Sequence, residues 1–402
     1  MTITINPQSI LSILTLRYDL TKISPIRKLK WNDFVENKFT NNEKVIEENI
    51  KNNFRSIIKD QKKVSIALSS GVDSTLLLAI LRKTLPKIEI DSFSIRFHDS
   101  IDESVNAEKI AKENDSTHHI INVENYFQEL PKAISITQLP FWDIHWYYLV
   151  KYASNYSKTI ISGDGGDELF GGYTFRYKKF LSMITKNSST REKTIAYLNC
   201  HERDWVIDQE KIFGSKLKFD WEKIYSEIDK YFDNSLSPLT QVFLADFNGK
   251  LVHNWSIVNS RFNEYFKMKS IIPLTDDSLI KIAIGLPNNL KYNVKEDVGK
   301  MILRKILKKY NVEKFLIAKK QGFSINTEKY WNVAGKKLCE QYVLEGELVK
   351  NNFINKQWIL KYIHKKDLNV RYVNKFFGIL AFEIWYRLFI TKSISPNDKI
   401  GY

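Results

Sequence analysis

The sequence predicts an α/β fold in which a parallel sheet carries helices on both faces and a mostly helical region follows. Three observations point to it. Between residues 64 and 162, short apolar strand-like segments alternate with longer helix-like segments, which is the pattern of a parallel sheet. Two loops rich in glycine, serine and aspartate directly follow strand-like segments. The chain has 402 residues, 43% of them hydrophobic, which is enough for a large buried core.

The individual elements follow from apolar runs and their periodicity. The expected strands are short and apolar or alternating, and they cover residues 64–68, 90–97, 119–123 and 159–162. The expected helices have helical length and composition, and they cover residues 42–59, 75–82, 103–113 and 142–154. From about Arg176 onward the pattern is mostly helical and ends in an aromatic-rich helix over residues 372–390.

Cysteine usage and hydropathy favour a cytoplasmic protein without a membrane segment. The two cysteines, Cys200 and Cys339, lie far apart and lack the spacing of a zinc site or a disulfide framework. The N-terminus shows no basic region followed by a long apolar run, as a secretory signal would. The apolar stretch 376–390 is too short to span a bilayer and contains Glu383 and Arg387.

The net charge of +15 has two interpretations. One is a polyanionic partner such as ATP, an acidic carrier protein or RNA. The other is a lysine-rich composition spread over solvated helix faces. We favour the second, because no dense basic tract stands out, and nucleic acid therefore ranks low as a partner.

The first candidate loop is Ser69-Ser70-Gly71-Val72-Asp73-Ser74, which joins an apolar strand to a helix. Small residues let backbone N–H groups approach a phosphate, and a helix N-terminus favours its negative charge. Asp73 could hold a magnesium ion that bridges phosphate oxygens. No lysine closes the loop, so it is not a Walker A motif. The alternative is a tight turn in which serine or aspartate caps the helix.

The second candidate loop begins at Ser162-Gly163 and places three carboxylates, Asp164, Asp167 and Glu168, within five residues. Crowded acids repel one another unless a metal, a cation or a reacting ammonium is present. The alternative is an aspartate- and glycine-rich surface turn. Together the two loops indicate a nucleotide site at the carboxyl edge of the sheet.

These residues resemble the synthetase domain of the asparagine synthetase family, whose loops read SGGxDS and SGDGGDELFGGY. The counterparts here are 69–74 and 162–173, and shorter matches occur at 93–97, 102–104, 117–119, 299–304, 319–323 and 382–386. The resemblance covers roughly residues 60 to 390. It implies an ATP-pyrophosphatase core of the adenine nucleotide alpha hydrolase-like type. It also implies a ligase that uses ATP and Mg²⁺ to adenylate a carboxylate, releases pyrophosphate and AMP, and forms an amide.

The resemblance assigns roles to individual positions. Lys320 matches the lysine that neutralises charge as the carboxylate attacks the α-phosphate. Asp164 matches an acid that binds ammonium or takes a proton from the amine, where lactam-forming relatives carry tyrosine. Asp73 and Asp167 match the carboxylates that hold magnesium. The positions matched to ATP and pyrophosphate are Leu68, Ser69, Ser70, Gly71, Val72, Asp73, Ser74, Ile95, Ser162, Gly163 and Lys300.

Some positions depart from the family pattern. Ser70 and Arg96 stand where glycine is usual. In the segment 260–276, Lys269 replaces an acid and Ile271 replaces an arginine. An acid exchanged for a base reverses the local field, which makes free aspartate a less secure substrate. The activated acid could instead belong to a peptide, a carrier protein or a glycan, or the enzyme could close a lactam.

The N-terminal 60 residues are expected to be a remnant of the glutaminase domain that begins with a catalytic cysteine in glutamine-dependent members. Here residue 2 is Thr, and only 16–19 and 26–29 resemble the tail of that domain. Nitrogen is therefore expected from ammonia, a separate glutaminase subunit or an amine on the substrate. Residues 61–402 are expected to form the synthetase-like domain, with a nucleotide-binding core at 61–180 and a largely helical part at 181–402.

Two readings from other classes remain. A PP-loop enzyme that acts on tRNA would fit the positive charge, but the sequence offers neither an RNA-binding motif nor a cysteine pair suited to thiolation. A non-enzymatic ATP-binding scaffold would need the loss of a metal or lysine position, and Asp73, Asp167 and Lys320 are all present. The sequence does not indicate an oligomeric state.

Overall fold

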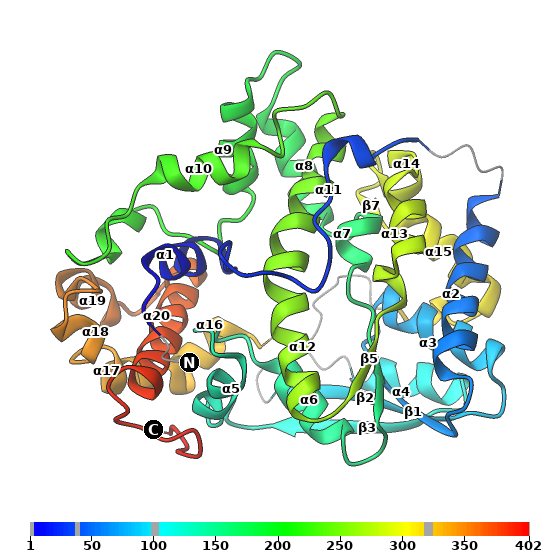
Figure 1. Cartoon of the computed structure of the whole chain (residues 1–402), viewed down its shortest axis with the longest axis horizontal. Coiled ribbons are helices and arrows are strands. Elements are labelled where there is room, and N and C mark those ends of the chain that lie inside the picture. Colours follow the sequence, from blue (N-terminus) through cyan, green and yellow to red (C-terminus); the bar gives the residue numbers. More distant parts are fainter. Residues whose placement is uncertain (1–3, 37–40, 98–103, 317–324, 402) are drawn as a thin grey trace.

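The computed structural model describes residues 4–36, 41–97, 104–316 and 325–401 and contains a five-stranded parallel sheet (Figure 1). The strand order is β3-β2-β1-β4-β5, so β2 and β3 are added on one side of β1, and β4 and β5 are added on its other side. The strands are β1 (Lys63–Ala67), β2 (Glu89–Phe97), β3 (Thr117–Val123), β4 (Thr159–Ile161) and β5 (Lys269–Ile271). The expected α/β fold with a parallel sheet is confirmed.

Helices make up most of the remaining structure. Those that precede or interrupt the first four strands are α1 (Pro7–Leu16), α2 (Asn42–Ile58), α3 (Val72–Thr84), α4 (Ser104–Glu113), α5 (Leu130–Thr137) and α6 (His145–Ala153). Those between β4 and β5 are α7 (Gly166–Phe170), α8 (Thr174–Met183), α9 (Thr190–Asn199), α10 (Trp221–Asp229), α11 (Pro238–Asp246) and α12 (Ser256–Tyr265), with the π-helix Phe247–Trp255 before α12. The last group comprises α13 (Asp277–Ile284), α14 (Asn288–Lys291), α15 (Met301–Leu307), α16 (Thr327–Tyr330), α17 (Lys336–Tyr342), α18 (Glu347–Lys350), α19 (Lys356–Ile363) and α20 (Val370–Phe389), and a small hairpin of β6 (Tyr292–Asn293) and β7 (Val298–Gly299) lies between α14 and α15.

The sheet separates two hydrophobic cores, because successive residues of a strand point to opposite faces. On one face, Val64, Ile66 and Leu68 pack with α2, α3 and α15. On the other face, Phe93 and Ile160 pack with α5, α6 and α12. Strand β1 could be predicted from its short apolar run, and β2 from the alternation of apolar and polar residues along it.

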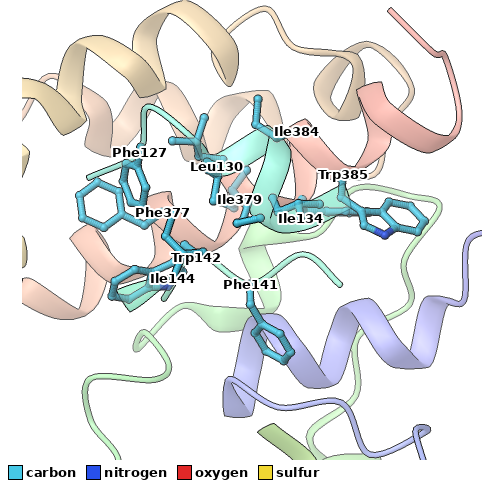
Figure 2. Packing of buried hydrophobic residues seen from close by; sticks show 14 of the residues in the cluster. Phe127, Leu130, Ile134, Phe141, Trp142, Ile144, Phe377, Ile379, Ile384 and Trp385 are labelled. Atoms are coloured by element: carbon cyan, nitrogen blue, oxygen red, sulfur yellow. The ribbon is translucent and has the colours of Figure 1, made fainter. Parts of the chain in front are cut away.

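The second core extends beyond the sheet to the C-terminal helix α20. Figure 2 shows Phe377, Ile379 and Ile384 of α20 packed with Phe127 and Leu130 near α5. Helix α20 is buried along most of its length, as its aromatic composition predicts. Among the described helices, none combines the length and apolarity that crossing a bilayer requires.

Strand β5 is an element that the sequence analysis missed. It has three residues and lies within a region of helical pattern, so it gives no periodic signal. Its pairing places Lys269 beside Thr159 and Ile271 beside Ile161. Lys269 is exposed and lies at the amino end of the strand, whereas the loops of interest lie at the carboxyl end. The expectation that Lys269 alters the field on the substrate side stays a prediction.

Candidate functional site

The loop after β1 forms a compact ring that leads into α3. The Ser69 N–H donates to Ser74 Oγ at 3.2 Å, and Ser74 Oγ donates to the Ser69 carbonyl oxygen at 3.0 Å. The Gly71 N–H donates to Ser69 Oγ at 3.2 Å. Helix α3 begins at Val72 without a side-chain cap, so the first-turn N–H groups have no capping acceptor. Free N–H groups at the start of a 13-residue helix are suited to an anion.

The loop after β4 lies directly against this ring. A methyl group built on Gly163 would lie 2.9 Å from Asp73 Cβ, and one on Gly166 would lie 2.5 Å from Asp73 Oδ1. Only glycine permits so close an approach. The two loops follow the adjacent strands β1 and β4, between which the strand order changes sides. Open α/β sheets bind ligands at such a topological switch point.

The ammonium group of Lys300 joins the two loops. Its Nζ contacts Asp73 Oδ2 and lies 2.7 Å from Asp167 Oδ1. The side chain of Lys300 is 6% exposed, and those of Asp73 and Asp167 are 14% and 16% exposed. The three residues therefore form a nearly buried group with two negative charges and one positive charge.

Lys300 reaches this position from outside the helix that follows it. Lys300 and Arg304 are four positions apart, a spacing that would place both on one face of a helix, but Lys300 precedes α15 as its N-cap, with φ of 59°. Its N–H donates to the Phe170 carbonyl oxygen at 3.0 Å, which fixes this left-handed residue to the second loop. Arg304 does lie in α15 and donates from Nε to the Gly299 carbonyl oxygen at 3.0 Å. The pKa of Arg304 is lowered by burial, an effect that nearby Asp73 opposes.

Asp164 lies at the other end of the second loop. Its Oδ2 accepts hydrogen bonds from Ser162 Oγ at 3.1 Å and from Asn259 Nδ2 at 3.0 Å. The pKa of Asp164 is raised, mainly by burial and also by the charge of Asp73. The two hydrogen-bond donors and His145 act in the opposite direction. A carboxyl group whose pKa is raised is a better proton acceptor than an ordinary aspartate.

Glu168, the third carboxylate of the loop, faces away from the site. It is 3% exposed, and Tyr173 Oη donates to its Oε1 at 2.7 Å. Burial raises the pKa of Glu168 to about 7. Of the three crowded acids, two therefore belong to the candidate site and the third supports the loop from the core.

The family model for asparagine synthase matches residues 46–387. The chain belongs to the asparagine synthase family. A relative in Bacillus subtilis, asparagine synthetase [glutamine-hydrolyzing] 1, is 24% identical over 372 residues, which cover 82% of this chain and 57% of the relative. A putative asparagine synthetase [glutamine-hydrolyzing] 2 from Methanocaldococcus jannaschii is 34% identical over 116 residues, 27% of this chain and 22% of the relative. The chain thus spans somewhat more than half the length of the first relative.

Solved structures give a weaker likeness. The NMN synthetase from Francisella tularensis is 16% identical, with a TM-score of 0.27, over 57% of this chain and 98% of that one. The U34-tRNA thiolase NcsA from Methanococcus maripaludis is 13% identical, with a TM-score of 0.25, over 56% of this chain and 79% of that one.

The site of this asparagine synthase family member fits a magnesium nucleotide in its donor chemistry. Asp73 Oδ1 and Ser70 Oγ are buried and accept no hydrogen bond within the described structure. Asp73 and Asp167 already converge on one cation, and carboxylate oxygens are the ligands that Mg²⁺ prefers. Phe93 of β2 pairs with the last residue of β1, and Ile95 lies two residues further along β2. Ile95 is therefore beyond the end of β1, beside the ring 69–74. Lys320 lies outside the described residues.

Two residues near Asp164 escaped the sequence analysis. Asn259 is 95 positions from Asp164 in sequence, and His145 lies two residues after Asp143. Nothing in one sequence shows that either residue lies near the second loop.

Proposed function

We propose that this protein is an ATP-dependent, AMP-forming amide ligase. It adenylates a carboxylate, releases pyrophosphate and transfers ammonia or an amine to the activated acyl group. One observation carries the proposal: carboxylates from two loops, Asp73 and Asp167, meet at the Lys300 ammonium beside the uncapped start of α3. This arrangement suits a triphosphate with its metal, because anion donors and hard oxygen ligands lie side by side.

The roles divide along the site. The ring 69–74 binds the pyrophosphate portion of ATP, with Lys300 as an additional cation. Asp73 and Asp167 would hold Mg²⁺, which supplies charge neutralisation on the phosphates when bound. Lys320 stabilises the charge that builds on the α-phosphate, a role that rests on the sequence match alone. Asp164 binds the incoming ammonium or takes a proton from the attacking amine.

The acid and the nitrogen donor belong to the same proposal. A small-molecule or carrier-bound carboxylate is the acid. Nitrogen comes from ammonia, from a separate glutaminase subunit or from an amine on the substrate. The two loops support the reaction class. The identity of the acid and of the nitrogen donor has to be determined by assay.

ATP–pyrophosphate exchange tests the proposal. The protein is incubated with ATP, Mg²⁺, labelled pyrophosphate and pooled carboxylic acids, and exchange is expected only when an acid is present. Asp73→Asn should reduce exchange at least about 100-fold, as the loss of a metal-holding group does. Asp115→Asn is the matched control, since the Asp115 side chain is 95% exposed. Absence of acid-dependent exchange, or full exchange by Asp73→Asn, would contradict the proposal.

A further inference from the structure

A histidine and an aspartate lie beside Asp164 and have no part in the proposed adenylation. His145 Nδ1 lies 2.8 Å from Asp143 Oδ1. Asp143 also accepts from Tyr126 Oη at 3.0 Å and from Arg17 Nη2 at 3.3 Å. Because Asp143 is the acceptor, the neutral imidazole carries its proton on Nδ1 and its lone pair on Nε2.

The helix formed by the π-segment 247–255 and α12 places His145 next to Asp164. The ring of Trp255 packs edge-on against His145 with centroids 5.6 Å apart. Asn259, four residues later, donates to Asp164. Residues four apart lie on the same helix face, so His145 and Asp164 rest against neighbouring positions of one surface. The electrostatic influence of His145 on Asp164 agrees with this placement.

Amide formation from ammonium releases two protons. One leaves before attack, because only the free amine carries a lone pair, and the other leaves as the new N–C bond forms and AMP departs with the electrons of the C–O bond. Asp164 alone can accept one proton per turnover. A second acceptor at the same place removes the need to return the first proton to water before the bond forms.

We propose that His145 is the second proton acceptor for the incoming nitrogen, acting through Nε2 with its ring fixed by Asp143. This inference rests on the proposed amide ligase function and specifies its nitrogen site. Asp164 takes one proton and His145 the other, so the nucleophile arrives as ammonium or a protonated amine. Asp73 is a further charge facing Asp164, and Arg17 is the charge behind Asp143.

The surroundings of Asp143 support a role in orienting the imidazole. Burial alone would raise the pKa of Asp143, but His145, Arg17 and Tyr126 together lower it, so Asp143 stays ionised and holds the His145 ring in place.

The test compares three reactions of one preparation, with the acid that supports exchange. They are ATP–pyrophosphate exchange, amide formation from ammonium, and hydroxamate formation from hydroxylamine, which is largely unprotonated at neutral pH. His145→Gln should slow the ammonium reaction about 100-fold more than it slows exchange. Its effect on the hydroxylamine reaction should be less than about tenfold, because one proton fewer has to leave.

His364→Gln is the matched control, because His364 is 62% exposed and should leave all three rates unchanged. ATP–pyrophosphate exchange in the same preparation shows whether the variant is folded. If His145→Gln loses exchange with the rest, Asp143→Asn replaces it and should show the same selective loss. Parallel loss of the ammonium and hydroxylamine reactions would overturn the inference, while intact exchange in the same variant would uphold the ligase. A wild-type protein without acid-dependent exchange would refute the ligase itself.

Discussion

Replacement of Lys300 by methionine tests whether the site is built around a cation. Lys300 Nζ contacts one oxygen each of Asp73 and Asp167, so Lys300→Met removes the ammonium that lies between two carboxylates. Two oxygens that contact one nitrogen are at most about 5 Å apart, and at an effective dielectric constant of about 20 their repulsion is about 3 kcal/mol. All three side chains are less than one fifth exposed, so solvent screens this repulsion little.

The assay is thermal unfolding in EDTA and in MgCl₂, without nucleotide. For a chain of this length, about 3 kcal/mol lowers Tm by about 3–4 °C, and Lys300→Met should show this loss in EDTA. Mg²⁺ should restore most of it, because a divalent cation can take the place of the lost ammonium between the two carboxylates. Lys305→Met is the control: this lysine is 68% exposed and pairs with Glu43 at the surface. A Tm in EDTA within 1 °C of wild type, or equal effects of Mg²⁺ on both variants, would refute the reasoning.

Three further predictions concern the loop after β4 and the core behind it. Gly166→Ala should abolish acid-dependent exchange while the protein stays folded by circular dichroism, because the added methyl would lie 2.5 Å from Asp73 Oδ1. In Glu168→Gln, urea unfolding should become less dependent on pH. The raised pKa of Glu168 stabilises the wild type below about pH 4, and this contribution of about 3 kcal/mol is lost as pH rises through 7. Arg176→Leu should cost about 3–5 kcal/mol by urea unfolding, since Arg176 Nη1 lies 3.2 Å from Asp246, which is 0% exposed.

Each of these predictions has a control or a contrary result. Gly401→Ala meets nothing within 4 Å and should keep full exchange. A wild-type protein whose stability did not fall between pH 5 and 8 relative to Glu168→Gln would contradict the role of burial at that residue. Lys179→Met removes the exposed Lys179–Glu202 pair at 2.6 Å and should cost less than about 1 kcal/mol, and a loss equal to that of Arg176→Leu would contradict the argument from burial.

The parts of the fold that the sequence revealed are those coded by neighbouring residues. Strand β1 is a buried apolar run, and the small residues of 69–74 mark the turn into α3, so both could be predicted. Strand β5 could not, because its three residues are recruited to the sheet by pairing with β4 rather than by their own pattern. Local propensity is a weak signal for so short an edge strand.

The candidate site shows the same division. Asp73, Asp164 and Asp167 lie in recognisable loops, whereas the conformation of Lys300 depends on its hydrogen bond to Phe170, 130 positions earlier. A lysine with φ of 59° is strained unless the surrounding structure holds it, and spacing to Arg304 alone favours a helix instead. Asn259 and His145 join the site only through tertiary packing.

The contact between α1 and α20 bears on the order in which the chain is made. Lys375 of α20 bonds to the carbonyl oxygen of Leu14, 361 positions earlier, and Gly378 packs against the Leu14 side chain. At about 5–20 residues per second, a ribosome needs roughly 20 to 70 s to synthesise the intervening chain. For that time the part of α1 that packs on α20 lacks this partner, so the two helices can join only late in the synthesis of the chain.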